Sequence, residues 1–326
     1  MKARILAVSS FLPEKILTNG QLSEMVDTND EWILSRTGIR ERRITEIPTW
    51  EMAARSAEKA LLSAELDPLE IDMIIGSTVT HDYKTPSMSC ILQHELGAKN
   101  AFCFDLNAAC SGFIFALDVV RRYIESGRVR HAMICSSEAL SRITDYSDRR
   151  SCILFGDGSA TAIVGADENS GVLETFLLSD GSGGAALYGT ELFRENPLVS
   201  NFSQRFDPPG AGALLMDGPE VYRFATRTMS EGIAKICELC GVGILDLDVI
   251  VPHQANIRII RSVINKYGID PEKVITNLEK YGNTSSASIP IGLSEALEDG
   301  RIKKGSKVCL VGFGAGLTSG TALIDW

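Results

Sequence analysis

The sequence predicts a layered α/β fold in which helices cover sheets of largely parallel strands. Short apolar runs, rich in β-branched residues, alternate along the chain with longer segments whose apolar residues recur at helical spacing. Several of these longer segments end at a glycine, which commonly terminates a helix. Two similar glycine-rich segments, one in each half of the chain, further predict a duplicated unit.

The individual elements follow from length and composition. Apolar runs of six to ten residues have the length of buried strands, and longer amphipathic segments are expected to form helices that cover a sheet. The predicted strands span 3–12, 71–79, 101–108, 131–137, 160–166, 248–253 and 307–314. The predicted helices span 50–66, 112–127, 218–241, 256–268 and 288–300.

The repeat joins FGDGSATAIVG, which begins at Phe155, to FGAGLTSGTALID, which begins at Phe313. Both segments read Phe-Gly-x-Gly, then small residues, then an apolar strand. Their 158-residue offset is about half of the 326-residue chain. We therefore expect two similar halves, residues 1–168 and 169–326.

The glycines Gly312, Gly314 and Gly316 follow a predicted strand and superficially resemble a dinucleotide-binding turn. Only ten residues follow Gly316, which is too few for the helix, second strand and acidic residue of that motif. The turn instead indicates a backbone that closely approaches a ligand or the facing half.

Composition limits the classes of partner that the protein is expected to bind. The chain is 44% hydrophobic and 23% charged, and its formal net charge is −10, so a general binder of nucleic acid or of anionic membranes is not expected. No apolar stretch has the roughly 18 residues of a membrane span. The N-terminal MKARILAVSSFLPEKI reads as a first strand and not as a signal peptide. We expect a cytoplasmic protein with reduced thiols.

The cysteines give little support for a metal site. Cys237 and Cys240 are the one closely spaced pair, and zinc would need a second pair or nearby histidines. Most of the eight cysteines lie in apolar stretches, where a thiol behaves as a small hydrophobe. No metal is therefore expected. The four histidines, which do not complete a cluster, are His81, His94, His131 and His253.

Cys110 differs from the other cysteines in its position. In DLNAACSGFIFAL a predicted strand ends just before it, and a helical pattern begins just after it. The positive end of a helix dipole lowers the pKa of a thiol and raises its nucleophilic fraction. The small neighbours of Cys110 leave room for a substrate. From the residues alone, a nucleophile and a small core residue are about equally supported.

Two polar residues are candidates to act with Cys110. His253 follows an apolar strand in VIVPHQANIRII, and Asn283 lies in the turn YGNTSSASIP. Each comes before a predicted helix. A histidine and an asparagine placed in this way could donate two hydrogen bonds to one developing oxyanion, although a lone histidine is more often structural.

With these residues together, the sequence resembles the β-ketoacyl-acyl-carrier-protein synthase III family of the thiolase superfamily. The resemblance runs over nearly the whole chain and is carried by motifs in order: NDEWILSRTGIRERRI, DLNAACSGFIFAL, LFGDGSATAIV, SDGSGG, VPHQANIRII, YGNTSSASIP and GFGAGLTSGTALIDW. It implies a five-layered αβαβα thiolase-like fold built from two duplicated halves. It also implies a homodimer.

The resemblance implies a reaction in two steps. Cys110 would take the starter acyl group from an acyl-CoA, and malonyl-acyl carrier protein would then enter. His253 and Asn283 would bind its thioester carbonyl as carbon dioxide leaves. Backbone N–H groups of Cys110 and of the Gly314–Ala315 turn would hold the acyl oxyanion, and Phe313 would border the malonyl site. Neither a metal nor a redox cofactor enters this scheme.

Binding residues are implied where the motifs match. Trp32 and Arg36 lie four residues apart, hence on one helix face, and resemble the pair that flanks the adenine and phosphates of CoA. Thr28 and Arg149 match other CoA-contacting positions. Arg150 could take the place of Arg149 if the register of that loop is shifted by one residue.

The acidic carrier protein would need a local basic patch. Arg258 matches the arginine that docks the carrier in this family, with Arg223 as a second basic position. Arg261 lies one helical turn from Arg258, and Lys266 follows Asn265, which stands where the family often has a lysine. The resemblance also implies that Thr85, just before PS in HDYKTPSMS, stands where family members that use acetyl-CoA often have a bulky aromatic that limits the acyl pocket. A threonine there predicts starters longer than acetyl.

Three functions stay open from the sequence. The first is the initiating condensation of fatty acid synthesis. The second is a related acyltransferase or condensing enzyme of secondary metabolism on the same scaffold. The third is a non-catalytic subunit that binds carrier protein, which the joint presence of Cys110, His253 and Asn283 disfavours. A thiolase proper is disfavoured because the turn GFGAGL lacks a second cysteine.

Overall fold

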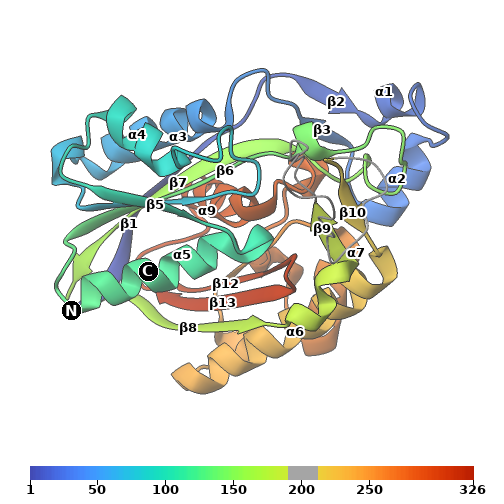
Figure 1. Cartoon of the computed structure of the whole chain (residues 1–326). Coiled ribbons are helices and arrows are strands. Elements are labelled where there is room, and N and C mark those ends of the chain that lie inside the picture. The colour runs from blue at the N-terminus through green and yellow to red at the C-terminus, as the bar shows by residue number, and fades with distance from the viewer. Residues whose placement is uncertain (190–211) are drawn as a thin grey trace.

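The computed structural model describes residues 1–189 and 212–326 and shows five stacked layers (Figure 1). Two helices lie between two sheets, and further helices cover the outer face of each sheet. The central helices are α5 (Gly112–Glu125) and α9 (Ser288–Glu298). The first sheet is covered by α3 (Thr49–Ala64) and α4 (Met88–Leu96), and the second by α6 (Gly218–Cys240), against which α7 (Ile257–Tyr267) packs.

The two sheets repeat one strand order. The first runs β1 (Lys2–Phe11), β7 (Asp157–Asp167), β6 (His131–Ala139), β4 (Met73–Ser77), β5 (Phe102–Leu106). The second runs β8 (Gly171–Ser179), β13 (Thr318–Asp325), β12 (Lys307–Gly314), β11 (Val249–Pro252). Each begins with two antiparallel pairs and continues with parallel pairing, which the second sheet extends by a bridge between Ile250 and Val274. The prediction of a duplicated layered fold is confirmed.

The expectation of largely parallel strands is wrong, because both sheets are mixed. Strands β12 and β13 are joined by residues 315–317 alone and pair antiparallel from Lys307↔Asp325 to Gly314↔Thr318. A parallel pair needs a crossover of a dozen residues or more. A connection of this length can therefore only form a hairpin.

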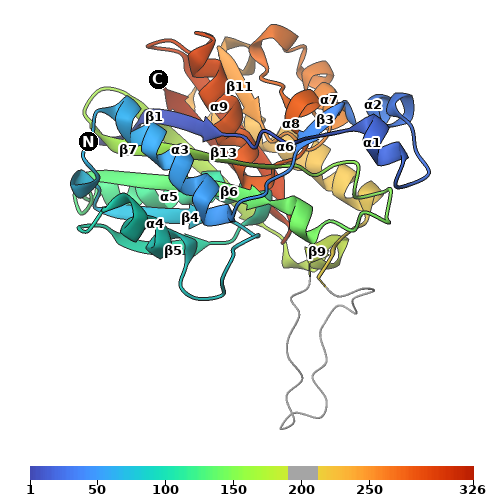
Figure 2. The same cartoon turned by 90° about the horizontal axis from the view of Figure 1, so that it is seen from above.

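Smaller elements gather toward one end of the layers, the right-hand side of Figures 1 and 2, where α2 contacts α7 and β9 pairs with β10. Thr18 caps the short helix α1, and Asn29 caps α2 through its side chain. The bounds are β2 (Ile16–Thr18), α1 (Asn19–Ser23), α2 (Asp30–Thr37), β3 (Glu41–Arg43), β9 (Leu187–Gly189), β10 (Leu214–Met216) and α8 (Leu278–Tyr281).

Both central helices begin after the same kind of turn. The side chain of Asn107 accepts the N–H of Ala109 at 3.2 Å, and that of Asn283 accepts the N–H of Ser285 at 2.9 Å. Ala109 and Ser285 both have a left-handed backbone, with φ of 46° and 48°. A 3-10 turn follows in each case and leads directly into α5 or α9. This pair of turns is a second sign of the duplication.

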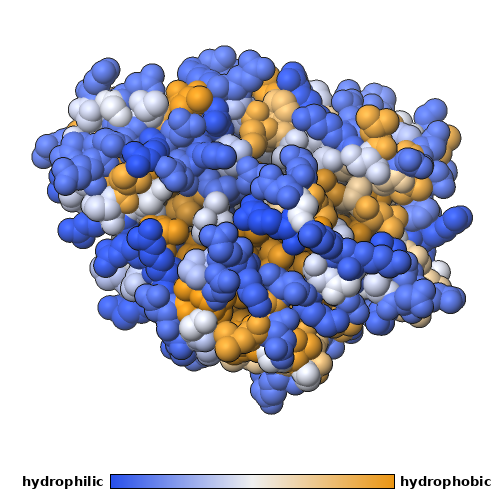
Figure 3. All heavy atoms as spheres, turned by 180° about the vertical axis from the view of Figure 1, so that it is seen from behind, coloured by the Kyte–Doolittle hydropathy of each residue, from blue (hydrophilic) through white to orange (hydrophobic). Residues whose placement is uncertain are grey.

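The core lies between the layers, and polar groups cover most of the outside. Fully buried aliphatic side chains of α5 and of both sheets form one continuous cluster. On the face shown in Figure 3, hydrophilic residues predominate and apolar ones form smaller groups between them. Among residues 1–189 and 212–326, no helix is both long and apolar enough to cross a membrane.

Candidate active site

A cavity of about 950 Å³ lies where the two halves meet, and it brings the three predicted reactive residues together. Cys110 comes from the first half, and His253 and Asn283 come from the second. Phe313, Gly314 and Ala315 also line the cavity.

Cys110 lies in the 3-10 turn Ala109–Ser111, immediately before α5, as its sequence pattern predicts. Its side chain is buried, and burial raises the pKa of the thiol to about 12. We expected the helix dipole to lower the pKa of Cys110, but the net shift of this pKa is upward. Desolvation of the buried thiolate is the largest cause of this rise.

His253 follows β11 and is 1% exposed. Its Nδ1 lies 2.7 Å from the hydroxyl oxygen of Ser288, and that oxygen also accepts the backbone N–H of Gln254 at 3.4 Å. A hydroxyl oxygen has two lone pairs, so this bond is compatible with either tautomer; we take the one in which Ser288 donates to Nδ1 and the imidazole proton lies on Nε2. Burial lowers the pKa of His253 to about 3, so the ring is an uncharged donor.

Asn283 is fixed by bonds on three sides. Its backbone N–H donates to the carbonyl of Leu154 at 2.8 Å, and its carbonyl accepts from Gly156 at 3.0 Å. Its side-chain oxygen is occupied by the N–H of Ser285. The amide nitrogen is therefore the group that Asn283 offers to the cavity, as a hydrogen-bond donor.

The glycine turn touches the segment that carries Cys110. A Cβ added to Gly314 would lie 2.6 Å from the backbone nitrogen of Cys110 and 3.0 Å from the Cβ of Ala109. Real Cβ atoms do not approach so closely, so this position requires glycine. The close backbone approach predicted from the sequence is present, and it is made to the segment that carries Cys110. Next to it, the Phe313 ring packs edge-on against His253, with ring centroids 5.1 Å apart.

The predicted CoA-binding residues cluster on and beside α2. The guanidinium of Arg149 lies 5.3 Å and that of Arg36 5.7 Å from the ring centroid of Trp32, and Arg36 also lines the cavity. The hydroxyl of Thr28 is buried without a hydrogen-bond partner. Arg150 lines the cavity too, but its guanidinium is paired with Asp148.

The predicted carrier-docking residues are spread along two helices. Arg258 lines the cavity and lies over the ring of Tyr222, at 5.9 Å from its centroid. Arg223, the next residue of α6 after Tyr222, is exposed. Arg261 lines a separate cleft of about 490 Å³. Lys266 lies at the far end of α7, eight residues or about 12 Å from Arg258 along the axis, so the structure does not bring these two together.

Thr85 does not line the cavity of this chain. It is exposed, in the loop between β4 and α4. The backbone N–H groups of Met88 and Ser89, at the start of α4, donate to the carboxylate of Asp105 in β5, so this loop lies beside the edge strand of the first sheet.

Sequence reasoning missed three buried polar residues near the reactive groups: Glu138, Ser285 and Ser288. A glutamate inside the apolar run of β6 was the available signal for Glu138, since glutamate is rarely fully buried. The two serines lie in a run of small polar residues, and nothing in that run distinguishes them.

The described part of the chain contains no group of three or more histidine, cysteine or acidic side chains placed to hold a metal ion. Cys237 and Cys240 lie on the last turn of α6, the first buried and the second partly buried.

The fold and the cavity define a class of protein. Two duplicated halves, with a cysteine at the start of a central helix facing a histidine and an asparagine, form a thiolase-fold condensing enzyme. Residues 104–181 match the family model of 3-oxoacyl-[acyl-carrier-protein] synthase III, and residues 237–326 match the model of its C-terminal part. The chain belongs to this family.

Its relatives cover the chain from end to end. It is 44% identical over 325 residues to the β-ketoacyl-[acyl-carrier-protein] synthase III of Clostridium acetobutylicum, covering 99% of this chain and 98% of that protein. The solved 3-oxoacyl-[acyl-carrier-protein] synthase III of Aquifex aeolicus superposes with a TM-score of 0.92 at 39% identity, covering 99% of this chain and 100% of that one. The priming β-ketosynthase of the R1128 polyketide pathway superposes with a TM-score of 0.91 at 36% identity, covering 99% and 96%.

Proposed function

We propose that the protein catalyses the initiating condensation of fatty acid synthesis. An acyl-CoA and malonyl-acyl carrier protein give β-ketoacyl-acyl carrier protein, carbon dioxide and CoA through an acyl-cysteine. The observation that carries this proposal is the single cavity in which Cys110, His253 and Asn283 meet. The nucleophile belongs to the first half, 1–168, and the two donors belong to the second half, 169–326.

The first step is transfer of the acyl group to Cys110. Its sulfur attacks the thioester carbonyl, and the carbonyl oxygen becomes an oxyanion. The backbone N–H of Cys110 and that of the Gly314–Ala315 turn are the donors for this oxyanion, because the two segments are in contact. Collapse of the intermediate expels CoA and leaves the acyl-enzyme.

The second step forms the carbon–carbon bond. Nε2–H of His253 and the amide of Asn283 hydrogen-bond the thioester carbonyl of malonyl-acyl carrier protein, so that negative charge can develop there as carbon dioxide leaves. The enolate then attacks the acyl-cysteine. The uncharged state of His253 suits this role, because it donates a hydrogen bond and keeps its proton.

The entrance supports binding of both substrates. The indole ring of Trp32 can stack against an adenine, and the guanidinium groups of Arg36 and Arg149, which both lie near this ring, can bind the phosphates of CoA. The unpartnered hydroxyl of Thr28 supports the same assignment. Arg258 lines the cavity, and the exposed Arg223 follows Tyr222, which also lines it. On a chain of net charge −10, this local positive charge suits an acidic carrier protein; Arg261 and Lys266 would extend it along α7.

We propose a homodimer that forms on the edge strand β5. This strand ends the first sheet and carries Phe102, which is 44% exposed and contacts Tyr123 with ring centroids 5.6 Å apart. An exposed apolar edge strand is a template for pairing with a second chain. Such a dimer would cover the loop of Thr85, so the part that Thr85 plays in starter choice depends on the partner subunit. We also expect a cytoplasmic location, which suits eight unpaired cysteines.

One assay tests the function. The protein is incubated with radiolabelled acyl-CoAs of different length and with malonyl-acyl carrier protein, and the products are resolved. Formation of β-ketoacyl-acyl carrier protein is expected, with branched or longer starters preferred over acetyl-CoA. Labelling of Cys110 without condensation would favour an acyltransferase of secondary metabolism, an alternative that the likeness to a polyketide priming enzyme supports. Absence of any label would indicate a non-catalytic subunit.

A further inference from the structure

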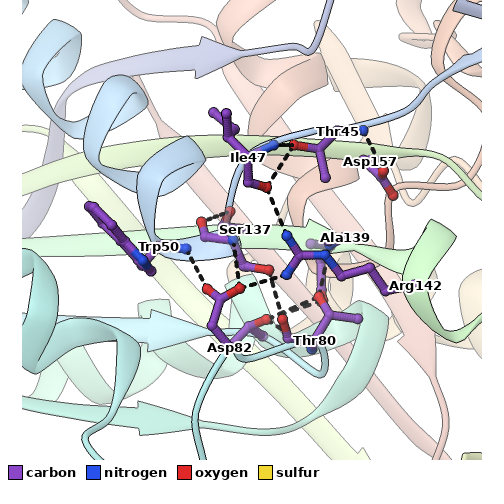
Figure 4. A network of polar contacts seen from close by, with 12 residues as sticks. Thr45, Ile47, Trp50, Thr80, Asp82, Ser137, Ala139, Arg142 and Asp157 are labelled. Atoms are coloured by element: carbon purple, nitrogen blue, oxygen red, sulfur yellow. Dashed lines mark hydrogen bonds and ion pairs between the residues drawn. The ribbon is translucent and has the colours of Figure 1, made fainter. Parts of the chain in front are cut away.

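The polar network of Figure 4 joins two segments of the chain that also line the cavity. One is the loop after β4, in which Val79 and His81 line the cavity. The other is the 3-10 turn Leu140–Ile143 after β6, whose first and last residues line it. Strands β4 and β6 are parallel neighbours, so the two segments leave the sheet side by side. We call Val79, His81, Leu140 and Ile143 the β4–β6 wall.

The β4–β6 wall lies beside the turn that carries Cys110. Val79 follows two residues after Ser77, the last residue of β4. A Cβ added to Gly112, two residues after Cys110, would overlap the side-chain oxygen of Ser77. The end of β4 therefore touches the start of α5, and Cys110 and Val79 open into the same cavity.

The wall offers apolar surface to a chain attached to Cys110. Leu140 is buried and belongs to the same apolar cluster as Phe313. Val79 and Ile143 are partly buried and pack against this cluster. Apolar side chains that line a cavity attract an apolar ligand, and their spacing decides how much of it fits. The position of the wall therefore bears on the size of the group that Cys110 can carry.

The loop half of the wall is held from behind by Thr80, which stands between Val79 and His81 and does not itself line the cavity. Its hydroxyl accepts the N–H of Ala139 at 2.8 Å, and its carbonyl accepts the hydroxyl of Thr49 at 2.7 Å. Thr49 is the first residue of α3. The loop is thus fastened both to the end of β6 and to the start of α3.

Asp82, two residues further on, supplies a cap that α3 lacks. Pro48 precedes this helix and offers no side-chain acceptor. The carboxylate of Asp82 accepts the N–H of Thr49 at 3.1 Å and the N–H of Trp50 at 2.9 Å, two of the groups that a helix start leaves without a partner. Its negative charge is favoured there by the helix dipole. Helix α3 packs on β1, β6 and β7, so Asp82 has a fixed position.

Arg142 connects this fixed point to the turn half of the wall. Its Nη1 donates to Asp82 Oδ1 at 2.5 Å and its Nη2 donates to the carbonyl of Ile47 at 2.9 Å, as Figure 4 shows. The preceding residue, Ser141, donates to the carboxylate of Asp157 through its N–H at 2.9 Å and through its hydroxyl at 2.6 Å. The two inner residues of the turn are therefore anchored, while its two outer residues line the cavity.

The ion pair contributes more to position than to stability. The side chain of Arg142 is 41% exposed and that of Asp82 is 12% exposed. A pair that is open to solvent on one side adds little to the free energy of folding. It nevertheless joins a side chain of the loop directly to a side chain of the turn, with a second bond from the same guanidinium to Ile47 that fixes its orientation.

We propose that Arg142 and Asp82 set the length of the starter acyl chain by holding the two halves of the β4–β6 wall at a fixed spacing. Both are positioning residues, because neither lines the cavity and both act through the wall. With the pair intact, a chain that outgrows the cavity has to displace an anchored wall. With the pair broken, the loop and the turn can move apart and a longer chain fits. The inference rests on the proposed function, because it concerns the substrate range of its first step.

Arg142→Met tests the proposal, since methionine keeps the apolar stem and removes the guanidinium. Acylation of Cys110 by acyl-CoAs of two to ten carbons is followed by rapid quench and intact-protein mass, and kcat/KM for acylation is determined at each length. One methylene in an apolar pocket changes discrimination by about 10–200-fold. We therefore expect the ratio of kcat/KM for the longest to the shortest chain to rise about tenfold or more, with the preferred length shifted upward.

Arg4→Met is the matched control. Arg4 pairs with Asp167 at 3.0 Å across β1 and β7, with side chains 37% and 22% exposed, and neither residue lines the cavity. The control should keep the length profile of wild type. The same profile in Arg142→Met would overturn the inference. An equal fall in kcat/KM at every length would also overturn it, because that result would indicate a general structural role.

A second measurement separates the inference from folding and from the proposed function. If Arg142→Met does not fold, Asp82→Asn, which keeps the size of the side chain and removes its charge, is measured in the same way and decides by the same criteria. Alkylation of the Cys110 peptide by N-ethylmaleimide and by N-hexylmaleimide needs no CoA substrate. The hexyl-to-ethyl rate ratio should rise in the variant, and an unchanged ratio would refute the inference. If no acyl-CoA acylates wild type, the proposed function fails, and the maleimide ratio alone decides whether the pair fixes the wall.

Discussion

Asn283→Asp should stop decarboxylation while leaving the shape of the cavity unchanged. The side-chain oxygen of residue 283 accepts the N–H of Ser285 at 2.9 Å, and an aspartate keeps that bond. The amide nitrogen, which faces the cavity, becomes an oxygen that can only accept. One of the two donors that we propose for the malonyl carbonyl is lost, which corresponds to about 2.7–4 kcal/mol or a 10²–10³-fold loss in rate. A negative charge beside the enolate adds to this loss.

The assay separates the two half-reactions of this variant. Release of labelled carbon dioxide from carboxyl-labelled malonyl-acyl carrier protein reports the step that needs Asn283. Acylation of Cys110 by acyl-CoA, followed by intact-protein mass, reports the step that does not, and it should stay within about threefold of wild type. Carbon dioxide release within tenfold of wild type, in a variant that folds and acylates normally, would refute the assignment of Asn283 as a donor.

Three further predictions follow from the geometry. Gly314→Ala places a Cβ 2.6 Å from the Cys110 nitrogen; we expect acylation to fall and the free energy of unfolding to drop by about 1–3 kcal/mol, measured by stopped flow and denaturant titration. Trp32→Ala should raise KM for acyl-CoA about tenfold, since adenine stacking contributes about 1–3 kcal/mol, with no change for an acyl-pantetheine that lacks adenine. Because burial holds the pKa of His253 at about 3 against 6.5 unfolded, the unfolded chain binds more protons in this range and stability is lost as pH falls below 6.5. Between pH 6.5 and pH 5, the free energy of unfolding of His253→Gln should therefore fall by about 2 kcal/mol less than that of wild type, measured in paired urea titrations.

The sequence indicated the three candidate reactive residues, which the structure brings to one cavity, because each stands in a distinctive local setting. Cys110 lies between a strand and a helix among small residues, and His253 and Asn283 lie at loop ends before helices. Local chemistry of this kind can be read without the fold. The duplicated architecture was visible for the same reason, because the repeated glycine turns are local features of the chain.

Other parts of the fold leave no such local pattern. Strand β8 lies at the edge of its sheet and contains a glutamate and a threonine, so it lacks the continuous apolar run of a buried strand. Helix α4 has nine residues, too few for a clear helical period. Strand direction in the mixed sheets depends on which connections cross over, and composition alone does not show this.

The surroundings of the site depend on contacts between distant residues. His253 meets Ser288 across 35 positions, and Glu138 meets Ser286 across 148. The raised pKa of Cys110 comes from burial, which becomes visible only when both halves are assembled. A sequence pattern can place a thiol at a helix start, but it does not measure how much water the thiol loses.

The paired turns before the central helices explain how duplication could give an asymmetric enzyme. Counted from Asn107 and Asn283, the position that holds Cys110 in the first turn holds Ser286 in the second. The same backbone frame therefore presents a thiol to the cavity in one copy and a hydroxyl to Glu138 in the other. The two asparagines likewise share one bonding pattern, and we assign a reaction role to the second. Single side-chain differences between two copies of one turn are therefore enough to make a duplicated scaffold chemically asymmetric, with the proposed nucleophile in one half and the proposed hydrogen-bond donors in the other.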